Sequence, residues 1–213
     1  MDVQCLEVKR INVSAAFYLS IEFQQTGYLI YRLSQAAYNT QERLPLNQFL
    51  PDTRKIGRNL VVLQNGWEQQ LEQNKQEFID EYVARESFIA AYPLTMSAAE
   101  FVNALSVNTS GSISQAERDS LIADLSSGAK TRAQVLRRIA EDDDFVRSEF
   151  ERGFVLMQYF GYLRRAPNEL PDGNFDGFNF WLTKLNQFNG NFINAEMVKT
   201  FIVSGEYRHR FGQ

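Results

Sequence analysis

The amino-acid sequence predicts an all-α protein, a helical repeat-like array of roughly seven to nine helices with no significant β-sheet. Three observations lead to this class. Apolar residues recur at the spacing of one helical face, and helix-start signals accompany several of these stretches. Gly and Pro, which punctuate turn-rich β proteins, number only 12 and 5 among 213 residues. The only strand-like feature is a short apolar run at 60–63.

A seven-residue motif recurs four times and gives the array its period. It begins with an apolar residue, continues through variable and polar positions, and ends in an aromatic ring. The copies occupy 17–23, 82–88, 139–145 and 201–207, and their last residues are Phe23, Phe88, Phe145 and Tyr207. These rings are 65, 57 and 62 residues apart, which predicts four related helix ends whose rings plug the core.

Apolar stripes and capping signals place the individual helices. We expect helices near 12–40, 66–91, 97–108, 114–127, 131–164, 176–188 and 194–208. Pairs with N-cap and N3 spacing mark helix starts: Ser97 with Glu100, Ser114 with Glu117, Thr131 with Gln134, and Asn74 with Glu77. Gly128 and Gly190 are expected to end helices, because a left-handed residue is needed there.

Proline residues indicate how the chain is divided. Pro45, Pro51 and Gly57 favour a loop over 41–64, with at most a short helical turn. Pro93 breaks the chain between two helical stretches. We therefore expect 1–213 to form one helical module of two lobes, 1–92 and 93–213, that meet near Pro93.

Charge and hydropathy argue against two kinds of partner. The net charge is −4, and no basic run is longer than a pair such as Arg137 and Arg138, so nucleic acid is not an expected partner. No apolar run approaches the ~20 residues that a membrane-spanning helix needs. Charged residues within the first ten positions also leave no export signal in this chain.

The segment 172–177 is the sharpest candidate for a ligand site. Asp172, Asn174 and Asp176 place oxygen atoms at alternate positions, as the start of a calcium loop does. Thr183 stands where the closing glutamate belongs, so these residues are weak metal candidates and we predict no metal site. In the alternative interpretation, Asp176 caps the following helix while Asp172 begins a turn.

No catalytic or cofactor-binding residues are predicted. His209 is the only histidine and Cys5 the only cysteine, so a histidine-based or thiolate site cannot be assembled. Cys5 is interpreted either as an inert thiol or as half of a disulfide whose partner lies upstream of this chain. The acidic run 142–144 points in several directions around a helix, which favours a solvated face or a cap.

Aromatic residues supply the remaining candidate surface. We expect a possible recognition patch that includes Tyr159, Phe160, Tyr162 and Trp181, in the region 154–188, with Trp67 as a further candidate. The alternative is that aromatic residues at helical spacing are core. Asn and Gln together number 31, a composition that suits a polar interaction surface.

Several stretches resemble a known family. The segments at 13–32, 154–168, 175–190 and 195–212 resemble the bacterial family known as domain of unknown function 4214. The resemblance rests on Asp176-Gly177 with Trp181, and on a closing helix with Ser204, Glu206 and Tyr207. It implies a C-terminal module of a secreted or cell-surface protein, and an upstream cysteine that pairs with Cys5. A more distant similarity is to the helical domain of phycobilisome rod linkers, which are basic whereas this chain is acidic.

The expected function is therefore a non-catalytic interaction or assembly module with a protein or glycan partner. It would be extracellular or on the cell surface, attached to upstream domains of a larger chain, and it would need no cofactor. The alternative is a carboxylate-dependent hydrolase, or an accessory domain, with a cleft between the two lobes. A pocket where buried carboxylates converge would favour the enzyme, and an exposed apolar-aromatic face would favour the binding module.

Overall fold

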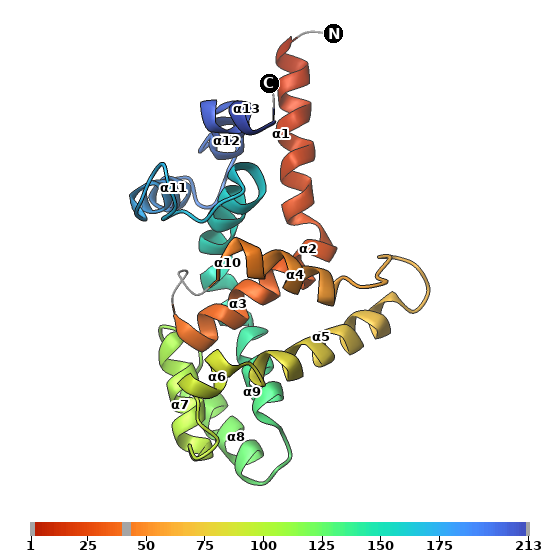
Figure 1. Ribbon diagram of the computed structural model, residues 1–213, viewed down its shortest axis with the longest axis vertical. Helices are drawn as coiled ribbons and strands as arrows, with labels where there is room; N and C mark the ends of the chain where they lie inside the picture. Colours follow the sequence, from red (N-terminus) through yellow and green to blue (C-terminus); the bar gives the residue numbers. More distant parts are fainter. Residues whose placement is uncertain (1–2, 40–43, 212–213) are drawn as a thin grey trace. The chain divides into compact units, whose positions relative to one another are not determined.

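The computed structural model confirms the all-α class (Figure 1). It describes residues 3–39 and 44–211, and those ranges contain no strand. The first helices are α1 (Val3–Leu19), α2 (Ile21–Gln25), α3 (Gly27–Tyr38), α4 (Leu46–Ile56), α5 (Trp67–Val83), α6 (Glu86–Ala91) and α7 (Ala98–Asn108). The chain continues with α8 (Gln115–Ser126), α9 (Arg132–Ala140), α10 (Asp143–Gln158), the π-helix η2 (Tyr159–Leu163), α11 (Asp176–Gln187), α12 (Met197–Val203) and α13 (Gly205–Phe211). None of the helices in this described part combines the length and apolar character needed to cross a membrane.

The chain forms two compact units, but their boundary differs from the predicted one. Unit 1 comprises Met1–Gln24 with Phe150–Gln213, and unit 2 comprises Gln25–Glu149. The predicted boundary at Pro93 is wrong, because this residue lies inside unit 2. The guanidinium of Arg132 donates to the carbonyl oxygens of Tyr92 and Pro93, both at 3.0 Å. The proline therefore ends a helix without separating two lobes, and the hydrolase alternative loses its predicted cleft.

Unit 2 is built around α3. Eleven consecutive residues of this helix, from Gly27 to Ala37, are buried, because α4, α7 and α9 all pack against it. Its sequence explains this placement: apolar and aromatic residues surround the helix instead of forming one stripe. Arg32 is the one charged residue buried in α3, and its Nε donates to the carbonyl oxygen of Ala140 at 2.7 Å. That bond ties the central helix to the end of α9.

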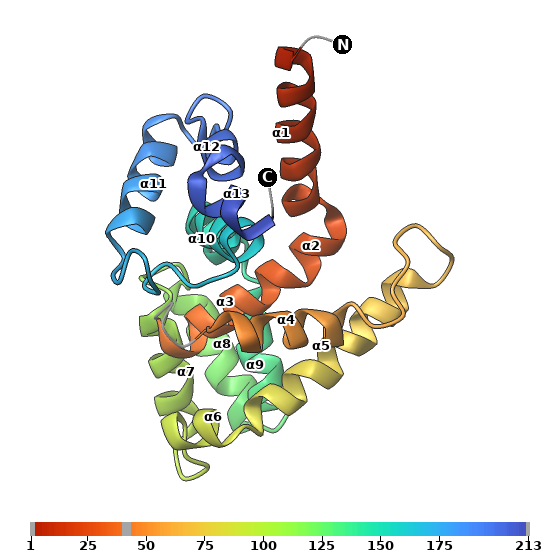
Figure 2. The same ribbon diagram turned by 45° about the horizontal axis from the view of Figure 1, so that its top comes forward.

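Unit 1 depends on a close approach between α1 and η2. The ring of Tyr18 packs edge-on against that of Tyr162, with centroids 5.6 Å apart. A Cβ at Gly161 would lie 1.5 Å from the hydroxyl oxygen of Tyr18, so only glycine fits there. The helix α1 also packs against α12, whereas α11 lies on the side of the unit away from α1 (Figure 2).

The four copies of the sequence motif all fold as a junction between two helices. Each junction interrupts one of the long predicted helices, at 12–40, 66–91, 131–164 and 194–208. The fourth motif residue is the N-cap position of the second helix, and the aromatic ring follows at N3. Ser20 Oγ accepts from the amide of Phe23 at 3.2 Å. Ser204 Oγ accepts from the amide of Tyr207 at 3.1 Å in the same geometry.

The remaining two junctions use other caps. Asp142 Oδ1 accepts from the amides of Asp144 and Phe145 at 3.0 and 3.3 Å. Arg85 stands at the equivalent place but makes no side-chain cap. The polar residues of the motif therefore serve chiefly to stop one helix and start the next.

The motif rings differ in burial. Phe23, Phe88 and Phe145 are 8%, 2% and 1% exposed, whereas Tyr207 is half-buried. Each unit contains two junctions, and in each unit the helices that lead into them pack together: α1 with α12, and α5 with α9. The structure does not confirm a repeat-like stacking of units, so that part of the fold stays a prediction.

Helix starts and ends follow the sequence signals at most positions. Ser97, Ser114 and Thr131 form the predicted capping boxes. Gly128 and Gly190 have φ of +76° and +77°, as their predicted roles as helix ends require.

The predicted cap at Asn74 is wrong. Asn74 is a buried residue inside α5, and its Nδ2 donates to the carbonyl oxygens of Ile56 and Arg58 at 2.8 and 2.7 Å. The predicted loop over 41–64 is also wrong in part, because α4 occupies Leu46–Ile56 with Pro51 inside it. The spacing of its buried Phe49 and Ile56 fits one helix face, and burial there outweighs the proline.

Replacing Asn74 by Ala should lower the free energy of unfolding of unit 2 by about 2–3 kcal/mol, because two carbonyl oxygens lose a buried donor. Gln69 on the exposed face of the same helix supplies the matched control, since Gln69→Ala removes an amide that water already solvates. Urea unfolding of both variants measures the difference. Equal losses for the two variants would contradict the role assigned to Asn74.

Candidate functional site

The predicted recognition patch does not form one surface. Tyr159, Phe160 and Tyr162 are 2%, 3% and 7% exposed, so the prediction that they line an exposed patch is wrong. They belong to η2, whose rings turn into the core of unit 1. Tyr159, for example, packs edge-on against Phe201 with centroids 5.2 Å apart. Burial raises the pKa of Tyr159 and that of Tyr162 to about 12.

Trp181, the fourth residue of that patch, belongs to an aromatic surface on α11. Phe180 is 59% exposed and Phe188, just after the helix, is 40% exposed, while Trp181 is half-buried. Residues three, four and seven positions apart share a helix face, so these rings line one side of α11 together with Lys184. The rings of Phe180 and Trp181 meet edge-on at 5.2 Å. Lys184 Nζ lies 5.2 Å from the centre of the Trp181 ring. We call these four residues the α11 stripe.

The opposite side of α11 anchors the helix. Phe178 and Leu185 are each 1% exposed and hold α11 on unit 1. Trp181 also contacts Phe201 of α12, with ring centroids 5.5 Å apart. A Cβ at Gly177 would lie 2.7 Å from the hydroxyl oxygen of Tyr159, so glycine lets α11 approach η2. The buried side chains of Phe178 and Leu185 therefore fix the position of α11, and the α11 stripe lies on the other side of this helix.

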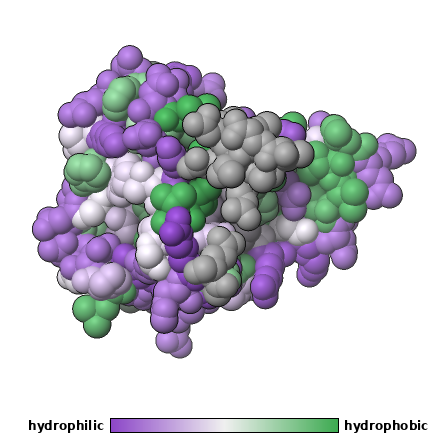
Figure 3. All heavy atoms as spheres, turned by 90° about the horizontal axis from the view of Figure 1, so that it is seen from above, coloured by the Kyte–Doolittle hydropathy of each residue, from purple (hydrophilic) through white to green (hydrophobic). Residues whose placement is uncertain are grey.

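Apolar side chains are also exposed elsewhere. Near the end of α1 and the start of α2, the exposed fractions of Val13, Phe17, Leu19 and Ile21 are 73%, 61%, 43% and 55%. Figure 3 shows hydrophobic residues in separate small clusters among hydrophilic ones on the face it draws. Val61 and Leu63, in the connection between α4 and α5, are 59% and 84% exposed. Trp67, the other tryptophan, is half-buried at the start of α5. Single aliphatic residues of this kind are common on protein surfaces. The exposed ring of Phe17 packs against the buried rings of Tyr18 and Phe23.

The candidate calcium segment is held by internal hydrogen bonds. Asn174 Oδ1 accepts from the amide of Asp176 at 2.9 Å, and Asn174 Nδ2 donates to Asp176 Oδ2 at 2.9 Å. Phe175 is the N-cap of α11 and Asp176 its first residue, so the predicted cap at Asp176 is wrong by one position. Within the described residues, no group of three His, Cys, Asp or Glu side chains is arranged to hold a metal ion.

Asp172 pairs instead with Arg165, a residue that sequence reasoning missed. The guanidinium of Arg165 is 5% exposed and contacts Asp172 Oδ2 at 2.8 Å and Glu206 Oε1 at 2.7 Å. It also donates to the carbonyl oxygens of Ala166, Pro167 and Glu169, at 3.1, 3.3 and 3.1 Å. Glu206, the acidic residue of the fourth motif, thus holds α13 on unit 1 through its ion pair with the buried Arg165. The only sequence signal was the basic pair at 164–165, which gives no partner.

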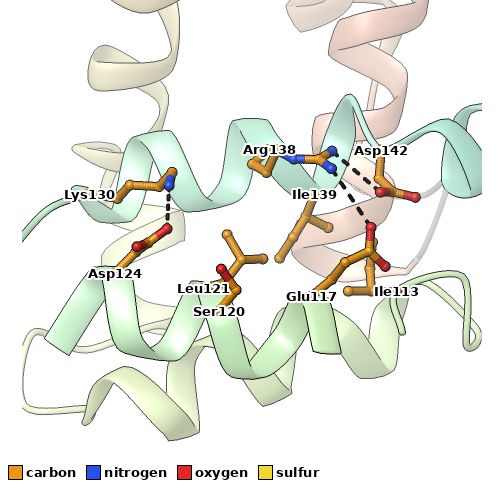
Figure 4. Close-up of a pocket in the computed structure, with 9 residues that line it drawn as sticks. All are labelled: Ile113, Glu117, Ser120, Leu121, Asp124, Lys130, Arg138, Ile139 and Asp142. Atoms are coloured by element: carbon orange, nitrogen blue, oxygen red, sulfur yellow. Dashed lines mark hydrogen bonds and ion pairs between the residues drawn. The ribbon is translucent and has the colours of Figure 1, made fainter. Parts of the chain in front are cut away.

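Carboxylates line a small pocket between α8 and α9 (Figure 4), and others line a wide, open hollow along α5. The volume of the α8–α9 pocket is about 130 Å³. That is room for about four water molecules. Its lining combines acidic, basic and apolar residues: Ile113, Glu117, Ser120, Leu121, Asp124, Lys130, Arg138, Ile139 and Asp142. Arg138 reaches Asp142 at 3.3 Å and Glu117 at 3.7 Å, and Lys130 pairs with Asp124. The pair of Arg138 with Glu117 joins α9 to α8, and Lys130 ties the connection before α9 to α8.

The two carboxylates near Arg138 have opposite electrostatic environments. Burial raises the pKa of Asp142, and the neighbouring Glu117 carboxylate raises it further. Hydrogen bonds from Ser114 lower the pKa of Glu117. Two neighbouring carboxylates with pKa values shifted in opposite directions are found in acid–base pairs of enzymes. Here each carboxylate also has a structural role. Asp142 caps α10, and Glu117 completes the capping box of α8.

Wild-type protein should lose stability relative to the Asp142→Asn variant as the pH rises. The folded chain binds the Asp142 proton more tightly than the unfolded chain does. Protonated Asp142 therefore stabilises the folded state fully at a pH below the usual carboxyl pKa, and this stabilisation is lost as the pH rises through the raised pKa of the folded chain. Asn keeps the capping oxygen. Urea unfolding between pH 4 and pH 7 measures the difference, with Asp143→Asn, an exposed neighbour, as the control. A difference independent of pH would contradict this assignment.

The other chemical candidates lie apart from these sites. His209 is exposed in the last turn of α13. In the acidic run, Asp142 is buried while Asp143 and Asp144 are exposed, which confirms that the three carboxylates point in different directions. The side chain of Cys5 lies outside the described residues, so its two interpretations stay open.

Comparisons with family models, with curated proteins and with solved structures found no match. The resemblance to the domain of unknown function 4214 and to the rod linkers therefore stays an expectation from the motifs. The functional interpretation rests on the geometry of the chain itself.

Proposed function

We propose that this chain is a non-catalytic interaction or assembly module of a secreted or surface-attached bacterial protein, and that the α11 stripe is its contact face. The observation that supports this proposal is the exposed pair Phe180 and Phe188 on a rigidly anchored helix. Side chains on an anchored helix lose little conformational entropy when a partner covers them, and Phe180 is further held by its contact with the Trp181 ring. A contact surface therefore explains their exposure better than core packing does.

The carboxylate-dependent hydrolase is the alternative. The α8–α9 pocket supports it through the split pKa values of Asp142 and Glu117. Its volume of about 130 Å³ and the capping roles of both carboxylates favour a structural pocket.

Sedimentation with cell envelopes tests the proposal. The labelled chain is mixed with envelopes from the cells that encode it, and the bound fraction is measured against protein concentration. We expect saturable binding that falls about tenfold or more for the double variant Phe180→Ser with Phe188→Ser, as for the loss of a central aromatic contact. Val61→Ser with Leu63→Ser removes two exposed apolar side chains elsewhere and should leave binding unchanged. Absence of saturable binding would contradict the proposed function.

A further inference from the structure

The chemistry around the α11 stripe specifies its partner more closely. Within 174–191 the only charged residues are Asp176 and Lys184, so the segment carries no net charge. Glu151 of α10 adds a carboxylate beside Gly190, so the surface has no excess of basic groups. Such a surface does not select an anionic lipid or a nucleic acid, both of which require a basic face. Neighbouring aromatic rings with neutral polar groups beside them suit a ligand that is itself neutral and polar.

Polar side chains stand next to the exposed rings. Thr183 and Gln187 follow Phe180 by three and seven positions, which places them beside its ring on the helix. Asn189 comes directly after Phe188. The side chains of Gln187 and Asn189 are exposed and make no hydrogen bond to other described residues. Hydroxyl and amide groups of this kind both donate and accept, as the hydroxyl groups of a sugar do.

The aromatic rings suit the apolar C–H groups of a sugar, as the amides suit its hydroxyl groups. One face of a pyranose ring carries C–H groups, which are apolar and slightly positive, and the face of an aromatic ring carries negative charge density. Phe180 and Phe188 are eight residues apart along the helix axis, a distance of about 12 Å. Two such platforms with amides beside them can contact two separate, non-adjacent units of one chain of sugars.

We infer that the α11 stripe, with Thr183, Gln187 and Asn189, is a binding surface for a neutral oligosaccharide. This inference rests on the proposed function and narrows its partner to a glycan. A protein partner is the competing outcome of the same experiment.

Selective destruction of the envelope components separates the two outcomes. One envelope sample is oxidised with periodate, which cleaves sugars at vicinal diols, and a second is digested with protease. We expect binding to be lost after periodate and retained after protease. The reverse pattern would overturn the glycan inference while the interaction module stands, and no binding to untreated envelopes would remove both.

Fluorescence gives a direct measurement at the stripe. In a Trp67→Phe variant, Trp181 is the only tryptophan. Titration with the glycan fraction released from the same envelopes should change its emission with a single saturation curve. Gln187→Ala should weaken this binding severalfold, whereas Gln69→Ala, an exposed amide on α5, should not. An unchanged emission spectrum at every glycan concentration would overturn the inference.

Discussion

The Phe145→Ala variant should lower the free energy of unfolding of unit 2 by about 3–5 kcal/mol. Phe145 is 1% exposed and stands at the third residue of α10, where the third motif ends. Truncation removes the largest apolar group of that junction and leaves a cavity that the surrounding helices cannot fill. The amide of Phe145 still donates to Asp142, so the loss measures the ring and not the cap.

Tryptophan placement makes this measurement specific to one unit. Trp67 lies in unit 2 and Trp181 in unit 1. A Trp181→Phe background therefore lets Trp67 fluorescence report the urea unfolding of unit 2 alone.

Two controls test the cause of the effect. Phe145→Leu keeps most of the apolar volume and should cost less than about 1.5 kcal/mol. Tyr207→Ala, measured through Trp181 in a Trp67→Phe background, should cost less than Phe145→Ala, because its ring is half-buried. Equal losses at Phe145 and Tyr207 would show that the motif rings do not stabilise the fold through burial.

Local interactions are the part of this fold that the sequence predicts well. Ser97, Ser114 and Thr131 were identified as caps because a capping box involves residues only three positions apart. The junctions follow the same rule, since Ser20 and Ser204 each accept from an amide three residues later. Information of this range is present in any short stretch of sequence.

Interactions between distant residues could not be predicted. Asn74 has the spacing of a cap with Glu77, but its amide reaches back 16 and 18 residues to the end of α4. Arg165 reaches 41 residues forward to Glu206. A polar side chain has several possible partners, and only the packing of the helices decides which one it meets.

The candidate surface shows the same limit. Periodicity identifies which residues of 154–188 are aromatic and share a face, but not which faces another helix covers. Tyr159 and Tyr162 are covered because α12 and α1 pack on η2, whereas Phe180 stays 59% exposed beside Trp181. Of the four rings predicted to be exposed, Tyr159, Phe160 and Tyr162 are buried and Trp181 is half-buried, while the exposed rings of this segment are Phe180 and Phe188. That they form a recognition surface stays a prediction.

Replacing Arg165 should lower the free energy of unfolding of unit 1 by about 3 kcal/mol. Arg165→Met removes the positive charge and leaves the carboxylates of Asp172 and Glu206 without their partner in a partly buried site. Removing one member of a buried ion pair costs about 3–5 kcal/mol. Because the two carboxylates are 34% and 24% exposed, water can solvate them in part, and the loss should lie near the lower limit.

The geometry of the guanidinium can be separated from its charge by a second substitution. Arg165→Lys keeps the charge but replaces the planar guanidinium, which has five N–H donors, by an ammonium group with three. The ammonium group cannot contact two carboxylates and three carbonyl oxygens at once. It should therefore recover only part of the loss. Arg164 supplies the matched control, since it is adjacent and exposed, and Arg164→Met should be nearly neutral. Urea unfolding followed through Trp181 measures all three variants in a Trp67→Phe background. If Arg165→Lys were as stable as wild type, charge alone would hold the closing helix, and the network of carbonyl oxygens would contribute nothing to the fold of unit 1.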